Sequence, residues 1–193
     1  MHILCDTSSI LLLIRIAPEM FIDERYECCT LNEIHDELFK TQRFKQKYPW
    51  RSNYKNKIKC LASQRVNDPD VRFYYDIIAR LNETERTSTY SGRIISLSRI
   101  DMKLLAFALA HGYKLSTGDQ GIKDFAYQEF FNIFEGHVSA LEMINLWLRK
   151  NLIEWNDELH EYVMDWSRQN EHPQPKEQKK LFENLTGRKY PGS

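Results

Sequence analysis

The sequence lacks the short motifs that mark redox, zinc and nucleoside-triphosphate sites. Its cysteines occur at positions 5, 28, 29 and 60, and none of their spacings resembles a CxxC pair. A zinc ribbon or a thiol redox motif is therefore not supported, and reduced, buried thiols are the simpler expectation. No GxxxxGK loop follows any predicted strand, so use of a nucleoside triphosphate is not supported either.

Long apolar runs are also missing. The apolar run at 10–14 is too short to cross a bilayer. Asp6 precedes this run and no lysine or arginine does, which argues against a signal peptide. We therefore expect a cytoplasmic protein with no membrane partner.

The composition fits one soluble globular domain with additions. A chain of 193 residues can bury one core but is short for two domains of ordinary size. Hydrophobic residues make up 42% and charged residues 28%, which argues against global disorder. The net charge of zero hides a segregation, because every charged residue from Lys40 to Lys59 is basic, whereas acidic residues predominate from Tyr127 to Glu171. This pattern suggests a polyanionic ligand on one side and a basic partner on the other.

Short apolar runs alternate with amphipathic segments along most of the chain. Strands are predicted at 2–5, 26–30 and 113–116, and a weaker strand at 132–134. Helices are predicted at 10–16, 31–38, 71–81, 98–110, 117–126, 139–150 and 155–166. The alternation predicts an α/β fold in which helices cover both faces of a parallel sheet. We expect a main domain at 1–150 with a basic insertion at about 40–92, followed at 151–193 by a helix and a polar tail.

Four acidic residues fall at the end of a predicted strand or near the start of a helix: Asp6, Glu37, Asp101 and Asp119. In open α/β sheets this edge is where ligands gather. Two unit charges roughly 4 Å apart repel by about 4 kcal/mol at an effective dielectric of about 20, so four carboxylates there need neutralisation. Hard divalent cations provide it, which makes a metal-dependent phosphodiesterase the preferred interpretation.

Each of the aspartates also has an ordinary structural explanation. Asp6 and Asp119 follow strands, where an aspartate commonly bonds the backbone of a turn. Ser98 with Asp101 three residues later resembles a capping box at the start of a helix. Asp101 nevertheless shares a face with the apolar residues of that helix, so both roles can coexist.

Glu37 competes with two other acids on the same predicted helix, Glu33 and Asp36, and any of them could be surface charge. At about 100° per residue, Glu37 lies nearer to the apolar stripe than Glu33 does, and Asp36 points nearly opposite. Glu37 is therefore the acid expected to face inward.

A family resemblance is carried by four short motifs in the right order. They are Asp6-Thr7-Ser8, Ile34-x-x-Glu37-Leu38, Asp101-x-x-Leu104-Leu105-x-x-Ala108 and Thr117-x-Asp119. As a set they resemble the PIN domain, and within it the VapC-like toxins. The resemblance covers roughly residues 1–40 and 93–150. It departs at Gly118, where many members carry a further acid or an asparagine, and the 40–92 stretch is longer than usual.

The resemblance implies a ribonuclease that uses Mg²⁺ or Mn²⁺. It also implies a three-layer α/β/α fold with a central parallel sheet of four or five strands, a homodimer and, for a toxin, inhibition by a protein antitoxin. The four acids Asp6, Glu37, Asp101 and Asp119 would then be the catalytic and metal-binding residues. Thr7, Ser8 and Thr117 would orient these acids through hydrogen bonds, although turn and capping roles explain the three hydroxyls equally well.

The basic stretch at 40–59 interleaves lysines and arginines with aromatic residues. Cations can hold phosphates while rings stack on unpaired bases, so this stretch is a candidate wall of an RNA groove. The residues expected to contact RNA are Arg43, Lys45, Lys47, Trp50 and Arg51. The alternative is a solvated surface whose aromatic rings pack into the core.

Two other classes of function compete with an active nuclease. One is a catalytically silent RNA-binding PIN-like module that keeps the acids but does not turn over. The other is a phosphatase with Asp6 as nucleophile, but the second aspartate two residues on, typical of haloacid-dehalogenase-like enzymes, is missing. The six histidines are scattered, and we assign none of them to catalysis or metal binding.

Overall fold

The protein is mainly helical and has only a small sheet. The computed structural model describes residues 2–62, 65, 67–170 and 174–191. Helices account for 60% of the chain and strands for 6%, with three strands in the sheet. The predicted α/β architecture with a central sheet of four or five strands is therefore wrong.

The sheet consists of β1 (Ile3–Cys5), β2 (Cys28–Cys29) and β3 (Lys114–Ser116). All strands are parallel in the order β2-β1-β3, and Leu4 lies opposite Cys29 on one side and Leu115 on the other. The central strand is fully buried, as expected for a parallel strand covered on both faces. Three of the four predicted strands are thus present, but each is only two or three residues long.

The predicted strand at 132–134 forms turns instead. Phe134 is buried, and its amide donates to the Phe130 carbonyl at 2.8 Å, which closes a turn after α7. The chain reaches the free edge of β3 only later, where Val138 N donates to the Leu115 carbonyl at 2.8 Å. A single bridge between Leu115 and His137 is all that forms there among the described residues.

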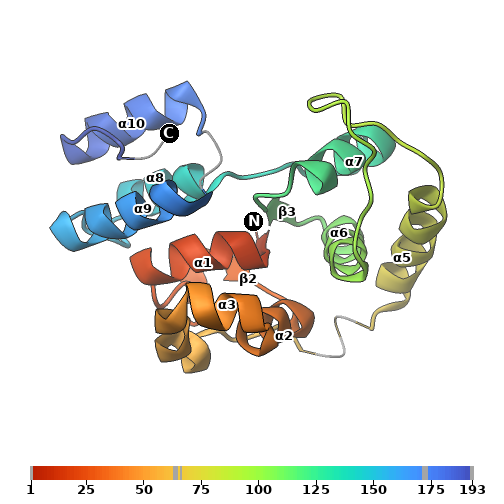
Figure 1. Ribbon diagram of the computed structural model, residues 1–193, viewed down its shortest axis with the longest axis horizontal. Helices are drawn as coiled ribbons and strands as arrows, with labels where there is room; N and C mark the ends of the chain where they lie inside the picture. Colours follow the sequence, from red (N-terminus) through yellow and green to blue (C-terminus); the bar gives the residue numbers. More distant parts are fainter. Residues whose placement is uncertain (1, 63–64, 66, 171–173, 192–193) are drawn as a thin grey trace.

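The helices of the main body are α1 (Thr7–Ile16), α2 (Asn32–Lys40), α5 (Pro69–Asn82), α6 (Arg99–His111), α7 (Gln120–Phe130) and α8 (Ala140–Arg149). A short 3-10 helix, η1 (Glu24–Tyr26), precedes β2. Figure 1 shows α1 between α2 on one side and α8 on the other, whereas α5, α6 and α7 lie together at the opposite end of the molecule. Among the described residues, no helix has both the length and the apolar character required to cross a bilayer.

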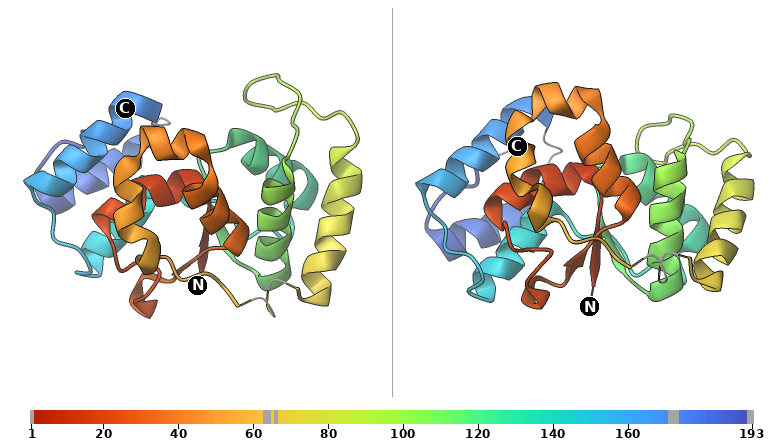
Figure 2. Two further views of the ribbon diagram at one scale, coloured as in Figure 1. Left: turned by 60° about the horizontal axis from the view of Figure 1, so that its bottom comes forward. Right: turned by 90° about the horizontal axis from the view of Figure 1, so that it is seen from below.

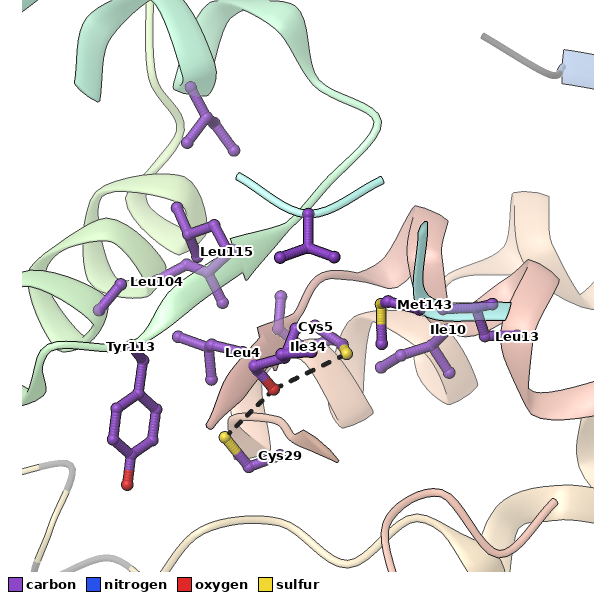
Figure 3. Packing of buried hydrophobic residues seen from close by; sticks show 14 of the residues in the cluster. Leu4, Cys5, Ile10, Leu13, Cys29, Ile34, Leu104, Tyr113, Leu115 and Met143 are labelled. Carbon is purple, nitrogen blue, oxygen red and sulfur yellow. Dashed lines mark hydrogen bonds between the residues drawn. The ribbon is translucent and has the colours of Figure 1, made fainter. Parts of the chain in front are cut away.

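The core surrounds the sheet. Leu4, Cys5 and Leu115 of the strands pack with Leu104 of α6 and Met143 of α8, all buried (Figure 3). The Cys5 and Cys29 thiols both approach the Ile3 carbonyl oxygen, at 3.9 and 3.5 Å. All four cysteines are free, two of them buried and two half-buried.

The basic insertion is ordered and mostly helical. It forms α3 (Gln42–Lys47) and the 3-10 helix η2 (Pro49–Lys57) before the chain reaches α5. Figure 2 shows these segments beside α1 and α2. The buried side chains of Tyr48 and Ile58 attach the insertion to the core.

The C-terminal segment forms α9 (Asp157–Asn170) and a further helix, α10 (Lys176–Thr186), where we predicted an irregular polar tail. Phe182 on α10 is fully buried, with its ring 4.8 Å from that of Trp155. Asn145 of α8 also donates to the Gln178 carbonyl at 2.9 Å. The Phe182 ring and the bond to the Gln178 carbonyl thus anchor α10 to the rest of the protein.

Candidate functional site

The turns that follow β1 and β3 lie side by side at the carboxyl end of the sheet. Asp6 N donates to the Ser116 carbonyl at 3.0 Å, so the two strands stay paired up to their ends. Gly118 N donates to Ser8 Oγ at 2.8 Å. These bonds join the two turns into one unit, from which α1 and α7 begin.

Asp6 is held by three donors. Its Oδ1 accepts from Ser9 N at 2.8 Å and from Ser8 Oγ at 2.9 Å, which makes it the N-cap of α1. Its Oδ2 accepts from Thr117 Oγ1 at 2.6 Å. Burial raises the pKa of Asp6 above its usual value, whereas the hydrogen bonds from Thr117, Ser9 and Ser8 lower it and offset part of that effect. Of the three hydroxyls expected to support the acids, Ser8 and Thr117 thus bond to the Asp6 carboxylate.

Asp101 and Asp119 also bond to backbone amides at helix starts. Asp101 Oδ2 accepts from Ser98 N at 2.9 Å, and Ser98 Oγ accepts from Asp101 N at 3.2 Å, which is the expected capping box of α6. Asp119 is the N-cap of α7 and accepts from Gly121 N at 2.6 Å. The structural explanation is therefore correct for both residues, and the question is whether they also face a common space.

All four acids face a common space, because they line one cavity of about 890 Å³. Asp6 and Asp119 come from the two turns, Asp101 from the first turn of α6 and Glu37 from α2. Glu37 accepts a hydrogen bond from Thr7 Oγ1, which ties α2 to the first turn of α1. The hydroxyl residues Thr7, Ser8 and Thr117 line the same cavity. All seven acid and hydroxyl positions selected from the sequence therefore line the same cavity.

The five residues expected to contact RNA divide into two groups. Arg43 and Lys47 of α3 line the cavity, whereas Lys45, Trp50 and Arg51 lie outside its lining. The prediction for Arg51 requires correction, since the residue is only 5% exposed. Its Nε donates to the Leu38 carbonyl at 2.7 Å and its Nη1 to the Tyr48 carbonyl at 3.2 Å.

Trp50 takes part in packing as well. Its ring makes edge contacts with Tyr48 and Tyr54, both at centroid distances of 6.0 Å. The Arg15 guanidinium lies 4.9 Å from the same ring. The aromatic residues of the insertion thus pack against the rest of the protein, which agrees with the alternative considered for this stretch.

The donor chemistry of the cavity suits a hard divalent cation, since carboxylate and hydroxyl oxygens are the preferred ligands of Mg²⁺ and Mn²⁺. Glu37, Asp101 and Asp119 each keep one carboxylate oxygen for which the described residues provide no hydrogen-bond donor. In the part of the chain that the structure describes, however, no three His, Cys, Asp or Glu side chains are grouped so as to hold an ion. The donors fit, but coordination would require either small side-chain movements or waters, which Mg²⁺ commonly retains.

Lys123 and His137 are among the cavity residues that were not selected from the sequence. His137 Nε2 lies 3.0 Å from the Thr117 carbonyl, so it carries the proton of the neutral ring. Burial and, next, the charge of Lys123 lower the pKa of His137 to about 4, whereas the Thr117 carbonyl raises it. Lys123 could have been found from its position one helical turn after Asp119, but the sequence holds no comparable signal for His137.

Comparison of the chain with protein-family models, with curated proteins and with solved structures gave no match.

Proposed function

We propose that the protein is a metal-dependent endoribonuclease that hydrolyses RNA phosphodiester bonds with Mg²⁺ or Mn²⁺. The observation that carries this proposal is the convergence of Asp6, Glu37, Asp101 and Asp119 on one cavity from four separate segments of the chain. Arg43 and Lys47 on the cavity wall are suited to hold a polyanion. The short motifs that resemble a PIN domain support the same activity, although the small sheet does not match the architecture that the resemblance implied.

Phosphodiester hydrolysis needs a nucleophile at neutral pH and relief of negative charge on the phosphate. A bound divalent ion supplies both, by lowering the pKa of its water and by neutralising the phosphate oxygens. In this proposal Asp6, Asp101 and Asp119 hold the ion, and Glu37 contributes to a second position. The hydrogen bonds from Ser8, Ser9 and Thr117 orient Asp6 before any ligand arrives, which lowers the cost of forming the site.

The test is Mn²⁺-dependent cleavage of total RNA by the wild type beside Asp6→Asn. We expect the wild type to cleave, a chelator to stop cleavage, and Asp6→Asn to be inactive. The matched control is Asp36→Asn, since Asp36 lies on the same helix as Glu37 but is exposed and pairs with Lys40 at 2.7 Å. Full activity of Asp6→Asn in this assay would refute the assignment.

The stability of Asp6→Asn provides a second readout. Burial raises the pKa of Asp6, so its ionised form costs folding free energy above the pKa of the unfolded chain. Asparagine removes that cost, and we expect the metal-free variant to be at least as stable as the wild type. In the wild type, Mg²⁺ or Mn²⁺ should raise the melting temperature by mass action.

A catalytically silent RNA-binding module is the second candidate. It is favoured by the finding that no metal-holding group of three ligating side chains occurs among the described residues. Titration of metal into the protein with labelled RNA separates the two, because a binding module retains the RNA at every metal concentration without cutting it.

The proposal extends to a cytoplasmic toxin of a toxin–antitoxin pair, as a homodimer inhibited by a protein antitoxin. The acidic residues of α9 could bind a basic segment of an antitoxin. Two of them already have partners within the chain, because Asp157 bonds to Arg188 and Asp165 lies 3.6 Å from Arg15. Expression of the chain with and without its neighbouring reading frame tests the toxin role, and sedimentation of the purified protein tests the dimer.

A further inference from the structure

Lys123 lies in the first turn of α7, four residues after Asp119. Side chains on a helix lean toward its N-terminus, which directs this position back toward Asp119. Lys123 is half-buried and lines the acid-containing cavity together with Asp6 and Asp119. A lysine one turn behind a candidate ligand therefore faces the same space as the carboxylates.

This ammonium group has no close partner in the described part of the chain. None of the ion pairs found there within 4.0 Å includes Lys123, and neither does any of the hydrogen bonds. Of the other half-buried lysines, Lys57 pairs with Glu19 and Lys103 with Glu33, whereas no ion pair among the described residues includes Lys47, Lys114 or Lys179. Burial lowers the pKa of Lys123, while the more distant charges of Asp124, Asp119 and Asp6 raise it. A partly desolvated cation without a direct partner costs free energy unless a ligand completes its contacts.

The remaining cations of the cavity come from a different wall. Arg43 and Lys47 belong to α3, and Figure 1 shows α3 and α7 on different sides of the N-terminal end of α1. Asp6 is the N-cap at that end of α1, and it therefore lies between the two helices from which these cavity-lining cations come. An extended polyanion that crosses the cavity would contact α3 with one phosphate and approach the carboxylates near Lys123 with another.

We propose that Lys123 contacts the substrate and binds the phosphate that undergoes cleavage, an inference that rests on the ribonuclease function proposed above. A phosphate entering a cavity with several carboxylates is repelled by them. Lys123 offsets that repulsion through a charge-assisted hydrogen bond to a non-bridging phosphate oxygen. Arg43 and Lys47 hold the flanking backbone, whereas Lys123 acts at the scissile position.

The experiment compares the wild type with Lys123→Met, Lys123→Arg and Lys114→Met. Lys114 is the matched control, because it is also half-buried but lies at the opposite end of β3, outside the cavity lining. Affinity for a short fluorescent single-stranded RNA is measured in EDTA, so that binding is read without cleavage. Cleavage of the same RNA is then measured with Mn²⁺, and thermal unfolding monitors the fold.

Lys123→Met should bind the RNA about tenfold more weakly, which corresponds to the loss of one charged hydrogen bond. The dependence of log K on log salt should become shallower by about 0.7, the value for one phosphate contact on a single strand. Lys123→Arg should restore most of the affinity and part of the cleavage, and Lys114→Met should behave as the wild type.

The outcomes separate the two proposals. If the wild type cleaves RNA and Lys123→Met binds and cleaves equally well, the role of Lys123 is refuted while the ribonuclease function stands. If Lys123→Met leaves RNA binding in EDTA unchanged but tightens Mn²⁺ binding, Lys123 only balances the carboxylates, and the inference is likewise refuted. If the wild type neither binds nor cleaves RNA, the proposed function fails and the inference fails with it.

Discussion

Two regions of this protein contain charged groups at high density, and they use them in opposite ways. In the cavity, carboxylates and lysines from separate segments face a common space. Where the insertion meets α1 and α9, the cations are used in packing. There Arg15 stacks on the Tyr162 ring at 3.7 Å, and Arg51 donates to buried carbonyls. A run of basic and aromatic residues in sequence therefore does not by itself define a binding surface, whereas the four acids from separate segments line one cavity.

The largest effect that would sharpen this contrast is expected at Asp119. Asparagine caps helices as well as aspartate does, so Asp119→Asn should keep α7 intact and change the unfolding free energy by less than about 0.5 kcal/mol. If the cavity is the catalytic centre, Mn²⁺-dependent RNA cleavage should nevertheless fall at least about a hundredfold. Rates and melting curves measured on the same preparation check both statements, and an active variant would remove Asp119 from the metal site.

A change at Arg51 should lower stability and leave activity unchanged. Arg51→Met removes two hydrogen bonds from a buried guanidinium and leaves the Leu38 and Tyr48 carbonyls without these donors. We expect a loss of about 2–3 kcal/mol in unfolding free energy by denaturant titration, with the specific activity of the folded fraction unchanged. Lys55→Met, at an exposed position of η2, is the control. Unaltered stability together with weakened RNA binding would show that Arg51 contacts RNA after all.

A smaller, pH-dependent effect is expected from His137. Its pKa in the folded protein, about 4, lies below the usual 6.5, so between these values the unfolded chain binds the proton more readily. Stability should fall as the pH drops from about 6.5 to about 4, and His137 should account for up to about 3 kcal/mol of that loss. His137→Gln should flatten the curve of unfolding free energy against pH in this window. Identical curves for variant and wild type would contradict the burial of a neutral ring.

The smallest effect is expected at Lys45, which lies on α3 beside two cavity-lining cations but points elsewhere. Lys45 is exposed and outside the cavity lining. Lys45→Gln should change the unfolding free energy by less than about 0.5 kcal/mol and RNA affinity by less than about threefold. Lys47→Gln, which alters the cavity wall, should weaken RNA binding more. Equal losses for the two variants would mean that net charge, rather than the cavity, attracts RNA.

Local signals in the sequence predicted several helices well. Ser98 and Gly112 bound α6 as a capping box and a left-handed C-cap with φ of 62°, because both act through the adjacent backbone. Ser139 starts α8 in the same way. Helix boundaries set by the nearest few residues can therefore be predicted from the sequence.

The extent of the sheet and the last helix could not be predicted in this way. The apolar runs around Cys28 and Phe134 are equally compatible with strand pairing and with simple burial, and only tertiary packing decides between them. Phe182 likewise stabilises α10 through its contact with Trp155, a residue distant in the sequence, so local signals do not reveal this helix. The acidic residues of the cavity were easier to predict, since chain order and strand ends limit where a side chain can lie. Lys123 and His137 line the cavity from positions that belong to no motif.

Each of the three aspartates in the cavity bonds to a backbone amide at the start of a helix: Asp6 for α1, Asp101 for α6 and Asp119 for α7. An ion or proton that draws electron density from these carboxylates must weaken those amide bonds. Ion binding in the proposed site would therefore be thermodynamically coupled to fraying of these three helices. Hydrogen exchange at these amides would register a ligand even when no large conformational change accompanies it.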